Sequence, residues 1–260
     1  MSDGDIVYEK RGHVGFIGFD RPDKRNAFTV KMFQRLAEVF TEADDDDDVR
    51  AIVVYGEGKD TTTGLDLMNV GPSFRAGEVP IPRELVDPWH VVGRLRKTPM
   101  VTAVHGRCFT LGTEIALCSD ICVAAEGTVF GLKEVRVGIM PAGGGTFRFV
   151  QTAGYSNAMR YVLTGDEFDA AEAFRLGVVQ EVVAPGTHLT RAIELAELIA
   201  AQAPLAVRAA LGNAQLSLLE GWRKAIADII PTQVPLINSE DAMEAAMAMM
   251  QKRPPNFKGK

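Results

Sequence analysis

Short apolar stretches alternate with amphipathic segments along most of the chain. Residues 6–9 and 14–19 alternate apolar with small or charged residues around Arg11-Gly12-His13, which predicts a β-hairpin. Thr29 is a favourable helix N-cap residue, and apolar residues then recur at helical spacing up to residue 43. The β-branched stretch at 51–55 predicts a buried strand. The chain therefore begins with two strands, a helix and a third strand.

The middle of the chain continues this alternation. Further buried strands are predicted at 101–104, 121–124 and 178–183, and helices from residue 112, at 156–163 and at 189–203. Strands that alternate with helices indicate a largely parallel sheet covered on both faces. Beyond residue 184 only helical patterns follow, to about residue 250. The fold class is therefore α/β, and we divide the chain into an α/β core, 1–190, and a helical C-terminal region, 191–260.

Composition narrows the classes of function. Of 260 residues, 47% are hydrophobic and 24% charged, which is typical of a folded globular chain. The net charge of −6 and the lack of a dense Lys/Arg cluster argue against nucleic acid as a partner. No window approaches the roughly 18 apolar residues of a membrane span, and the acidic N-terminus lacks a signal-peptide core. We expect a cytoplasmic protein that does not bind membranes.

Several chemistries lack their signatures in this sequence. There is no dinucleotide, P-loop, nucleophile-elbow or zincin motif. Cys108, Cys118 and Cys122 form no CxxC pair, so we expect reduced, buried thiols and no zinc site. His105 follows a predicted strand, and we expect a structural role for it. The acidic run 44–48 has Val49 where a calcium loop needs glycine, which favours a solvated helix end.

Four motifs together point to a known family. They are RPDKRNA at 21–27, TGLDL at 63–67, VHGRCF with TLGTEIAL at 104–117, and KE with VRVGIMPAGGGT at 133–146. In this order and spacing, the chain resembles the enoyl-CoA hydratase/isomerase (crotonase) family over nearly its whole length, including the C-terminal PPNFKGK. The resemblance implies a crotonase-like superhelix of ββα repeats. It also implies a homotrimer or a dimer of trimers, with region 191–260 serving oligomerisation.

The resemblance also implies an oxyanion hole. Moving a proton beside a thioester carbonyl passes through an enolate, whose oxygen needs fixed donors in a site shielded from water. Backbone N–H groups at a glycine-rich turn and a helix N-terminus supply such donors. By resemblance the two donors are the N–H groups of Leu65 and Leu111, the latter at a position where the family usually has glycine. Gly64 and Gly112 would let the backbone come close enough.

Glu114 and Glu134 fall on the two positions that carry catalytic carboxylates in the hydratases. Hydrating a 2-trans-enoyl-CoA to a 3-hydroxyacyl-CoA needs one group to activate water and one to protonate C2. The resemblance implies that Glu134 supplies the C2 proton and that Glu114 holds the water. The alternatives are that Glu114 merely complements its helix dipole and that Glu134 is an exposed loop charge.

The same resemblance implies a groove for CoA. Arg25 and Ala27 would lie along pantetheine and adenine, and the segment Thr63, Gly64, Leu65, Asp66 and Leu67 would close the groove, with Gly112 beside it. Lys258 would meet a CoA phosphate. Alternatively, 21–27 forms only a turn, Asp66 only caps a helix, and the tail is solvated. Residues 68–89 form either a variable wall over the acyl pocket or an ordinary surface segment. The resemblance implies no metal, nicotinamide or flavin cofactor, since CoA is the carrier part of the substrate.

Other activities of the same fold remain open. A double-bond isomerase needs mainly one base, at Glu134, and could dispense with Glu114. A dienoyl-CoA isomerase would carry an aspartate just after the GIMP segment, where this chain has Ala142-Gly143-Gly144. A CoA-ester hydrolase and a non-catalytic acyl-CoA-binding or RNA-binding relative are further alternatives. The two glutamates argue against loss of catalysis and the acidic charge argues against RNA.

Overall fold

The main sheet forms the centre of the fold. The computed structural model describes residues 5–78 and 80–260. Six strands lie in the order β1-β2-β3-β4-β6-β9. They are β1 (Asp5–Arg11), β2 (Val14–Asp20), β3 (Ala51–Gly56), β4 (Met100–Val104), β6 (Ile121–Ala125) and β9 (Glu181–Val183). The β1–β2 hairpin is antiparallel and every other pair is parallel, as the sequence pattern predicts.

A second, three-stranded sheet is not predicted by the sequence pattern. It joins β5 (Arg107–Phe109), β7 (Val129–Gly131) and β8 (Phe168–Asp169) in that order. Strands of two or three residues are too short to show a period of two. β5 leads through Thr110 into α3 (Leu111–Cys118), so this small sheet sets where the helix carrying Glu114 begins.

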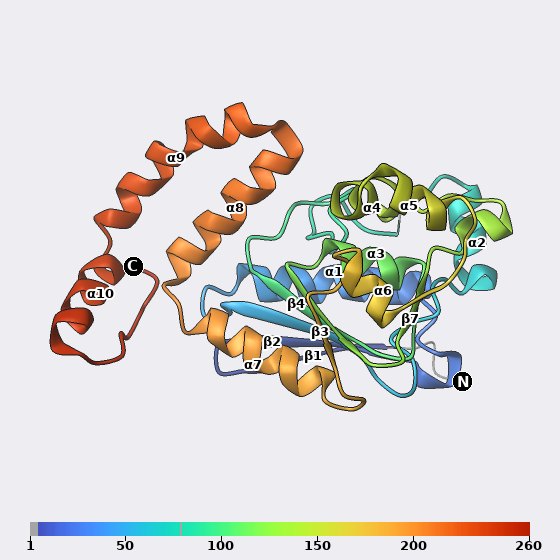
Figure 1. The fold of residues 1–260 in the computed structure, drawn as a ribbon, viewed down its shortest axis with the longest axis horizontal. Helices are drawn as coiled ribbons and strands as arrows, with labels where there is room; N and C mark the ends of the chain where they lie inside the picture. Colours follow the sequence, from blue (N-terminus) through green and yellow to red (C-terminus); the bar gives the residue numbers. More distant parts are fainter. Residues whose placement is uncertain (1–4, 79) are drawn as a thin grey trace.

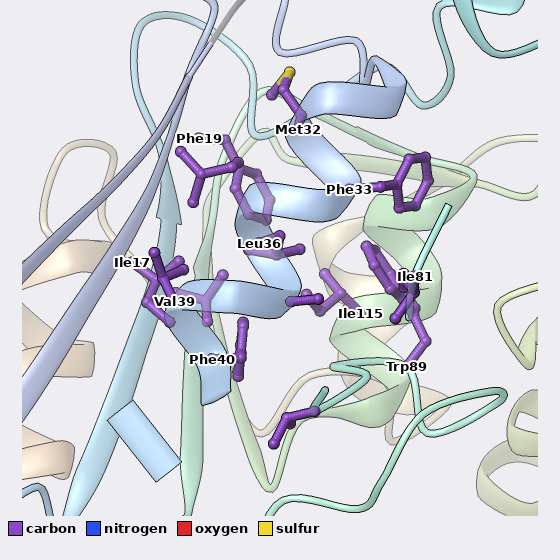
Figure 2. Packing of buried hydrophobic residues seen from close by; sticks show 14 of the residues in the cluster. Ile17, Phe19, Met32, Phe33, Leu36, Val39, Phe40, Ile81, Trp89 and Ile115 are labelled. Atoms are coloured by element: carbon purple, nitrogen blue, oxygen red, sulfur yellow. The ribbon is translucent and has the colours of Figure 1, made fainter. Parts of the chain in front are cut away.

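Helices cover both faces of the main sheet (Figure 1). α1 (Val30–Asp45) lies on one face, and its N-cap Thr29 accepts a hydrogen bond from the N–H of Met32, as predicted. Figure 2 shows Leu36 and Phe40 of α1 between the sheet and Ile115 of α3. α7 (His188–Ala200) packs its small residues against β3, β4 and β6 on the other face.

The other helices of the core are shorter. They are η1 (Pro22–Lys24), α2 (Leu67–Arg75), η2 (Glu134–Val137), α4 (Gly145–Ala153), α5 (Tyr155–Val162) and α6 (Ala170–Arg175). α4 packs on α3 and α5 packs on α4. Phe149, Tyr161 and Phe168 pack on one another in a separate core. This second core fixes α4, whose first turn faces the Glu114 side chain.

The C-terminal helices project from the core (Figure 1). α8 (Pro204–Glu220) and α9 (Trp222–Ile237) pack on each other, and α10 (Glu240–Gln251) follows. The predicted helical extension is confirmed, although the boundary that we place at residue 190 falls within α7, which belongs to the core packing. No single helix in the described part is long and apolar enough to cross a membrane. Only α7 and α8 taken together reach the required length and hydropathy, and the chain bends by 108° between these two described helices.

Two predicted boundaries shift for local reasons. The strand expected at 178–183 pairs only from Glu181, because the chain is still in the turn after α6, where Gly177 has a φ of 77°. The helix expected at 189–203 ends at Ala200, since Pro204 already starts the next helix. The three cysteines are buried and unbridged, as predicted.

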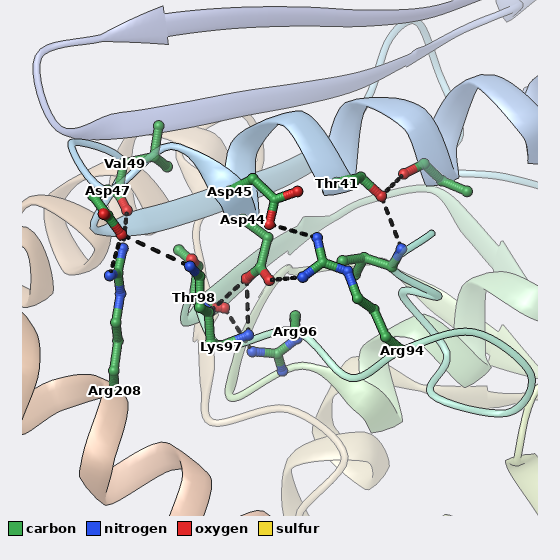
Figure 3. A network of polar contacts seen from close by, with 12 residues as sticks. Thr41, Asp44, Asp45, Asp47, Val49, Arg94, Arg96, Lys97, Thr98 and Arg208 are labelled. Carbon is green, nitrogen blue, oxygen red and sulfur yellow. Dashed lines mark hydrogen bonds and ion pairs between the residues drawn. The ribbon is translucent and has the colours of Figure 1, made fainter. Parts of the chain in front are cut away.

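The interpretation of the acidic run 44–48 as a solvated helix end was wrong for Asp44. This carboxylate is buried, and one of its oxygens accepts hydrogen bonds from the N–H groups of Lys97 and Thr98 at 2.8 and 2.9 Å (Figure 3). The Arg94 guanidinium lies 3.8 Å from its other oxygen. Asp44 therefore pins the segment before β4 to the end of α1. A local pattern cannot reveal this role, because its partners lie 50 or more residues away.

Candidate active site

A cavity of about 910 Å³ lies between α2, α3, η2 and the segment before β4. Glu114, Glu134, Leu65, Leu111 and Thr110 all line it. The structure therefore brings both predicted carboxylates and both predicted donor residues to one cavity. The segment 68–89 supplies part of the cavity wall, including Phe74 and Trp89. The structure therefore favours a wall over the pocket, and not an ordinary surface segment, for these residues.

Glu114 enters the cavity from the first turn of α3 and is only 3% exposed. Its Oε1 accepts a hydrogen bond of 2.9 Å from the N–H of Gly145, the first residue of α4. Burial raises the pKa of this carboxyl, and the N–H groups of Gly145 and Gly143 work against that rise. A Cβ at Gly143 would lie 2.7 Å from Glu114 Oε2. The glycine run therefore holds one side of the carboxylate in place.

Glu134 begins η2 and is 6% exposed, so it is not an exposed loop charge. Its Oε2 is buried and has no hydrogen-bond partner in the described structure. Burial, reinforced by the negative charge of Glu114, raises the pKa of Glu134 to about 7. A carboxyl with such a pKa exchanges its proton near neutral pH, which suits a general acid or base.

Among the described residues, the N–H groups of the two predicted donors have no hydrogen-bond partner. Leu65 forms an isolated bridge with Phe28, and the bonds of that bridge use Gly64 and Asp66 on either side. Leu111 is the first residue of α3, whose opening N–H groups have no partner within the helix. Its carbonyl accepts a hydrogen bond of 3.1 Å from the Trp89 indole, which fixes this peptide segment.

Gly64 and Thr110 bring these two segments into contact. Gly64 has a φ of +101°, and a Cβ there would come within 2.0 Å of Thr110 Oγ1. Thr110 itself has a φ of 52°, which β-branched residues rarely adopt. Its N–H is bonded to the Gly131 carbonyl, and its own carbonyl accepts the N–H of Glu114. The close approach that the sequence predicts at Gly64 is therefore present.

The predicted CoA segments lie together beside this turn. The Arg25 carbonyl accepts a hydrogen bond of 3.0 Å from the Thr63 N–H, while its guanidinium is largely exposed. Asn26 is fully buried, and its amide donates to backbone carbonyls of the 57–61 segment. Ala27 is half-buried, and its carbonyl accepts from Arg21. The motif at 21–27 is thus a turn that is tied to the segment before Gly64.

The remaining predicted binding residues are placed differently. Asp66 caps α2 and pairs with Arg21 at 2.9 Å, so it has the structural role that we considered. Leu67 is 47% exposed at the start of α2. Gly112 is required by packing, because a Cβ there would lie 2.5 Å from Thr62. Lys258 is not brought to the cavity: its N–H donates to Asp241 on α10, and the C-terminus lies beside that helix (Figure 1).

Sequence reasoning missed several residues that shape the site. Trp89, Gly143, Gly145 and Thr110 all contact the Glu114 or Leu111 segments. The glycine run was visible in the sequence, but its role depends on the return of α4 toward α3. His105 pairs with His188 at 3.1 Å and with the Gly58 carbonyl, away from the cavity, in agreement with a structural role. In the described residues, no group of three or more His, Cys, Asp or Glu side chains could hold a metal ion.

Comparison with known proteins defines the class. Residues 9–260 match the model of the enoyl-CoA hydratase/isomerase family. A solved structure of a probable enoyl-CoA hydratase/isomerase from Mycobacterium abscessus shares 45% identity and a TM-score of 0.94, covering 98% of each chain. Enoyl-CoA hydratase EchA19 of Mycobacterium tuberculosis is 33% identical over 98% of this chain and 97% of the relative.

The chain therefore belongs to the enoyl-CoA hydratase/isomerase family. The predictions of the family, of the crotonase fold and of an enzyme of the hydratase type are confirmed. A relative named for a different substrate, the 2,3-dehydroadipyl-CoA hydratase of Escherichia coli, is 30% identical over 98% of this chain and 99% of its own length. The roles of individual residues rest on the geometry above.

Proposed function

We propose that this protein adds water to 2-trans-enoyl-CoA thioesters and forms 3-hydroxyacyl-CoA. The observation that carries the proposal is the arrangement of two buried carboxyls, Glu114 and Glu134, on one cavity. The names of the relatives, most of them enoyl-CoA hydratases, support the same reaction.

The thioester oxygen is proposed to accept hydrogen bonds from the N–H groups of Leu65 and Leu111. Both residues line the cavity and both are fixed by neighbours, Leu65 through the Phe28 bridge and Leu111 through Trp89. Preorganised amides of this kind stabilise the negative charge that develops on the oxygen when water attacks C3. The leucine in place of glycine at 111 keeps the N–H that this role requires.

The proton steps are assigned to the two glutamates. Glu114 is proposed to orient the water and accept one of its protons, since one of its oxygens is already anchored by Gly145. The hydroxyl adds to C3, the electron pair of the double bond moves toward the carbonyl, and C2 then takes a proton; transfer of the water proton from Glu114 to Glu134 afterwards restores both carboxyls. Glu134 is proposed to give that proton, because its pKa of about 7 keeps a large protonated fraction near neutral pH.

CoA is proposed to lie across the joined segments around Arg25, Ala27 and Thr63. The exposed guanidinium of Arg25 suits a phosphate, and the Arg25–Thr63 backbone bond holds the two segments as one surface. Lys258 is left out of this site within one chain because it lies against α10. Arg25→Ala should raise the KM for the thioester and change kcat little.

The test is turnover of a 2-enoyl-CoA in deuterated water. Hydration predicts a 3-hydroxyacyl-CoA carrying deuterium at C2. Deuterium uptake at C2 without hydration would instead support a double-bond isomerase, and no change in any thioester would refute both. Glu114→Gln separates the two activities further, since a hydratase loses its water-binding carboxylate and an isomerase that depends on Glu134 keeps most of its rate.

A further inference from the structure

We propose that the acyl group handled at this site is bulky, apolar and uncharged. The inference rests on the proposed function and adds the class of acyl chain. It follows from three properties of the cavity beyond the two carboxyls: its size, its wall and the sign of its charges.

The cavity is much larger than a short acyl chain requires. Its volume is about 910 Å³, near the upper end of pockets that bind drug-sized ligands. At about 30 Å³ for each water molecule, a space of this size holds about 30 waters. A four-carbon acyl group and its thioester would leave most of it hydrated, so most of the wall would contribute nothing to binding.

The wall that faces this space is aromatic and aliphatic. Phe33, Phe74, Ile81 and Trp89 line one side, and Ile139 and Met140 line another. The ring centroids of Phe33 and Trp89 lie 5.5 Å apart, and those of Phe33 and Phe74 lie 6.5 Å apart. The rings thus form a continuous surface, whereas a quaternary ammonium group would need rings that surround an open centre.

The charged groups of the wall argue against an anionic acyl end. Among the described lining residues there is no Lys, Arg or His, and the charged side chains are Glu78, Asp87, Glu114 and Glu134. Asp87 is buried and accepts the N–H groups of Trp89, Val91 and Val92, so it serves the fold of the wall. A terminal carboxylate would meet no cation among the described lining residues and would be desolvated beside negative charges.

The experiment compares kcat/KM of the wild-type enzyme across matched thioesters. The probes are a four-carbon, a six-carbon and a ten-carbon 2-enoyl-CoA, an aryl-bearing 2-enoyl-CoA, and six-carbon acyl groups that end in a carboxylate or a quaternary ammonium. We expect the ten-carbon or the aryl substrate to exceed the four-carbon one by at least about tenfold, because each buried methylene adds up to about fourfold. The carboxylate should fall about 100-fold below its apolar six-carbon counterpart.

A variant pair tests the wall itself. Val91 lines the cavity and is 47% exposed, so Val91→Trp adds bulk at the rim. It should lower the ratio of ten-carbon to four-carbon kcat/KM about tenfold. The matched control is Leu163→Trp, at a position 69% exposed at the end of α5 and outside the cavity, which should leave the ratio unchanged.

The outcomes separate the two proposals. If no thioester is hydrated, the proposed function fails. If hydration occurs but the four-carbon, the carboxylate-bearing or the ammonium-bearing substrate is preferred, only the inference about the acyl group is overturned. The wild-type comparison decides this even if Val91→Trp does not fold.

Discussion

Ionisation of Glu134 should make the protein less stable as the pH rises toward neutrality. Its side chain is 6% exposed and one carboxyl oxygen has no partner, so the charged form is disfavoured in the folded state. The pKa is about 7 in the folded protein against 4.5 for an unperturbed glutamate. Between these two values the unfolded chain has released its proton while the folded chain retains it.

The size of the effect follows from proton linkage. Where the folded state binds more protons than the unfolded state, the free energy of unfolding falls as the pH rises. A separation of about 2.5 pKa units corresponds to about 3 kcal/mol at 1.36 kcal/mol per unit. The loss should begin near pH 4.5 and level off above about pH 7. Glu134→Gln cannot ionise and should not show this component.

The assay is chemical denaturation of the wild type and Glu134→Gln at half-unit steps from pH 4.5 to 8. The free energy of unfolding of the wild type minus that of the variant should decline by about 3 kcal/mol across this range. Other titrating groups affect both proteins and largely cancel in the difference. Parallel curves would show that burial does not raise the pKa of Glu134, and the proton-donor assignment would lose its electrostatic basis.

Three further perturbations follow from the structure. Gly64→Ala should lower kcat at least about tenfold, because its Cβ would meet Thr110 Oγ1 at 2.0 Å. The control Gly127→Ala should keep kcat, since Gly127 has a similar φ of +82° but nothing within 4 Å of an added Cβ. Equal effects of the two substitutions in steady-state kinetics would contradict the close approach at the donor turn. Asp44→Ala should cost about 2–4 kcal/mol of unfolding free energy, because it removes the acceptor of the buried Thr98 N–H and of the part-buried Lys97 N–H. Asp45→Ala, at the neighbouring exposed position, should cost less than about 0.5 kcal/mol, and similar denaturation midpoints for the two variants would refute the bracing role. We also propose that a trimer covers the exposed apolar side chains of α8–α10, which include Leu218, Ile230 and Met249. Because one chain has a mass of 28.2 kDa, light scattering should give about 85 kDa for a trimer, or twice that for paired trimers. The mass of a monomer would contradict this proposal.

The long elements could be predicted from the sequence because their periodicity is local. The hairpin, α1 and the buried strands β3, β4 and β6 carry their own patterns of apolar residues. The small sheet of β5, β7 and β8 could not be predicted from the sequence. Its strands have only two or three residues, too few to show a periodic pattern, and their pairing partners are distant in the chain. The burial of Asp44 has the same origin: its partners, Lys97 and Thr98, are set by the tertiary fold.

The candidate site, too, could be predicted from the sequence only in part. The motifs around Glu114 and Glu134 select the residues, but only the fold shows that both reach one cavity and that Glu134 is buried. The anchoring of Glu114 by Gly145 and of Leu111 by Trp89 depends on segments that return from elsewhere in the chain. Lys258 illustrates the opposite case, where a motif predicts proximity that a single chain does not provide.

We propose that Glu134 and Glu114 act together on one water molecule and one acyl thioester. The most direct measurement is the hydration rate of Glu134→Gln with the preferred 2-enoyl-CoA, combined with a dissociation constant for the saturated acyl-CoA. We expect kcat to fall by about 100-fold or more, as for loss of a general acid, while the dissociation constant changes less than about threefold. An unchanged kcat in the folded variant would contradict it.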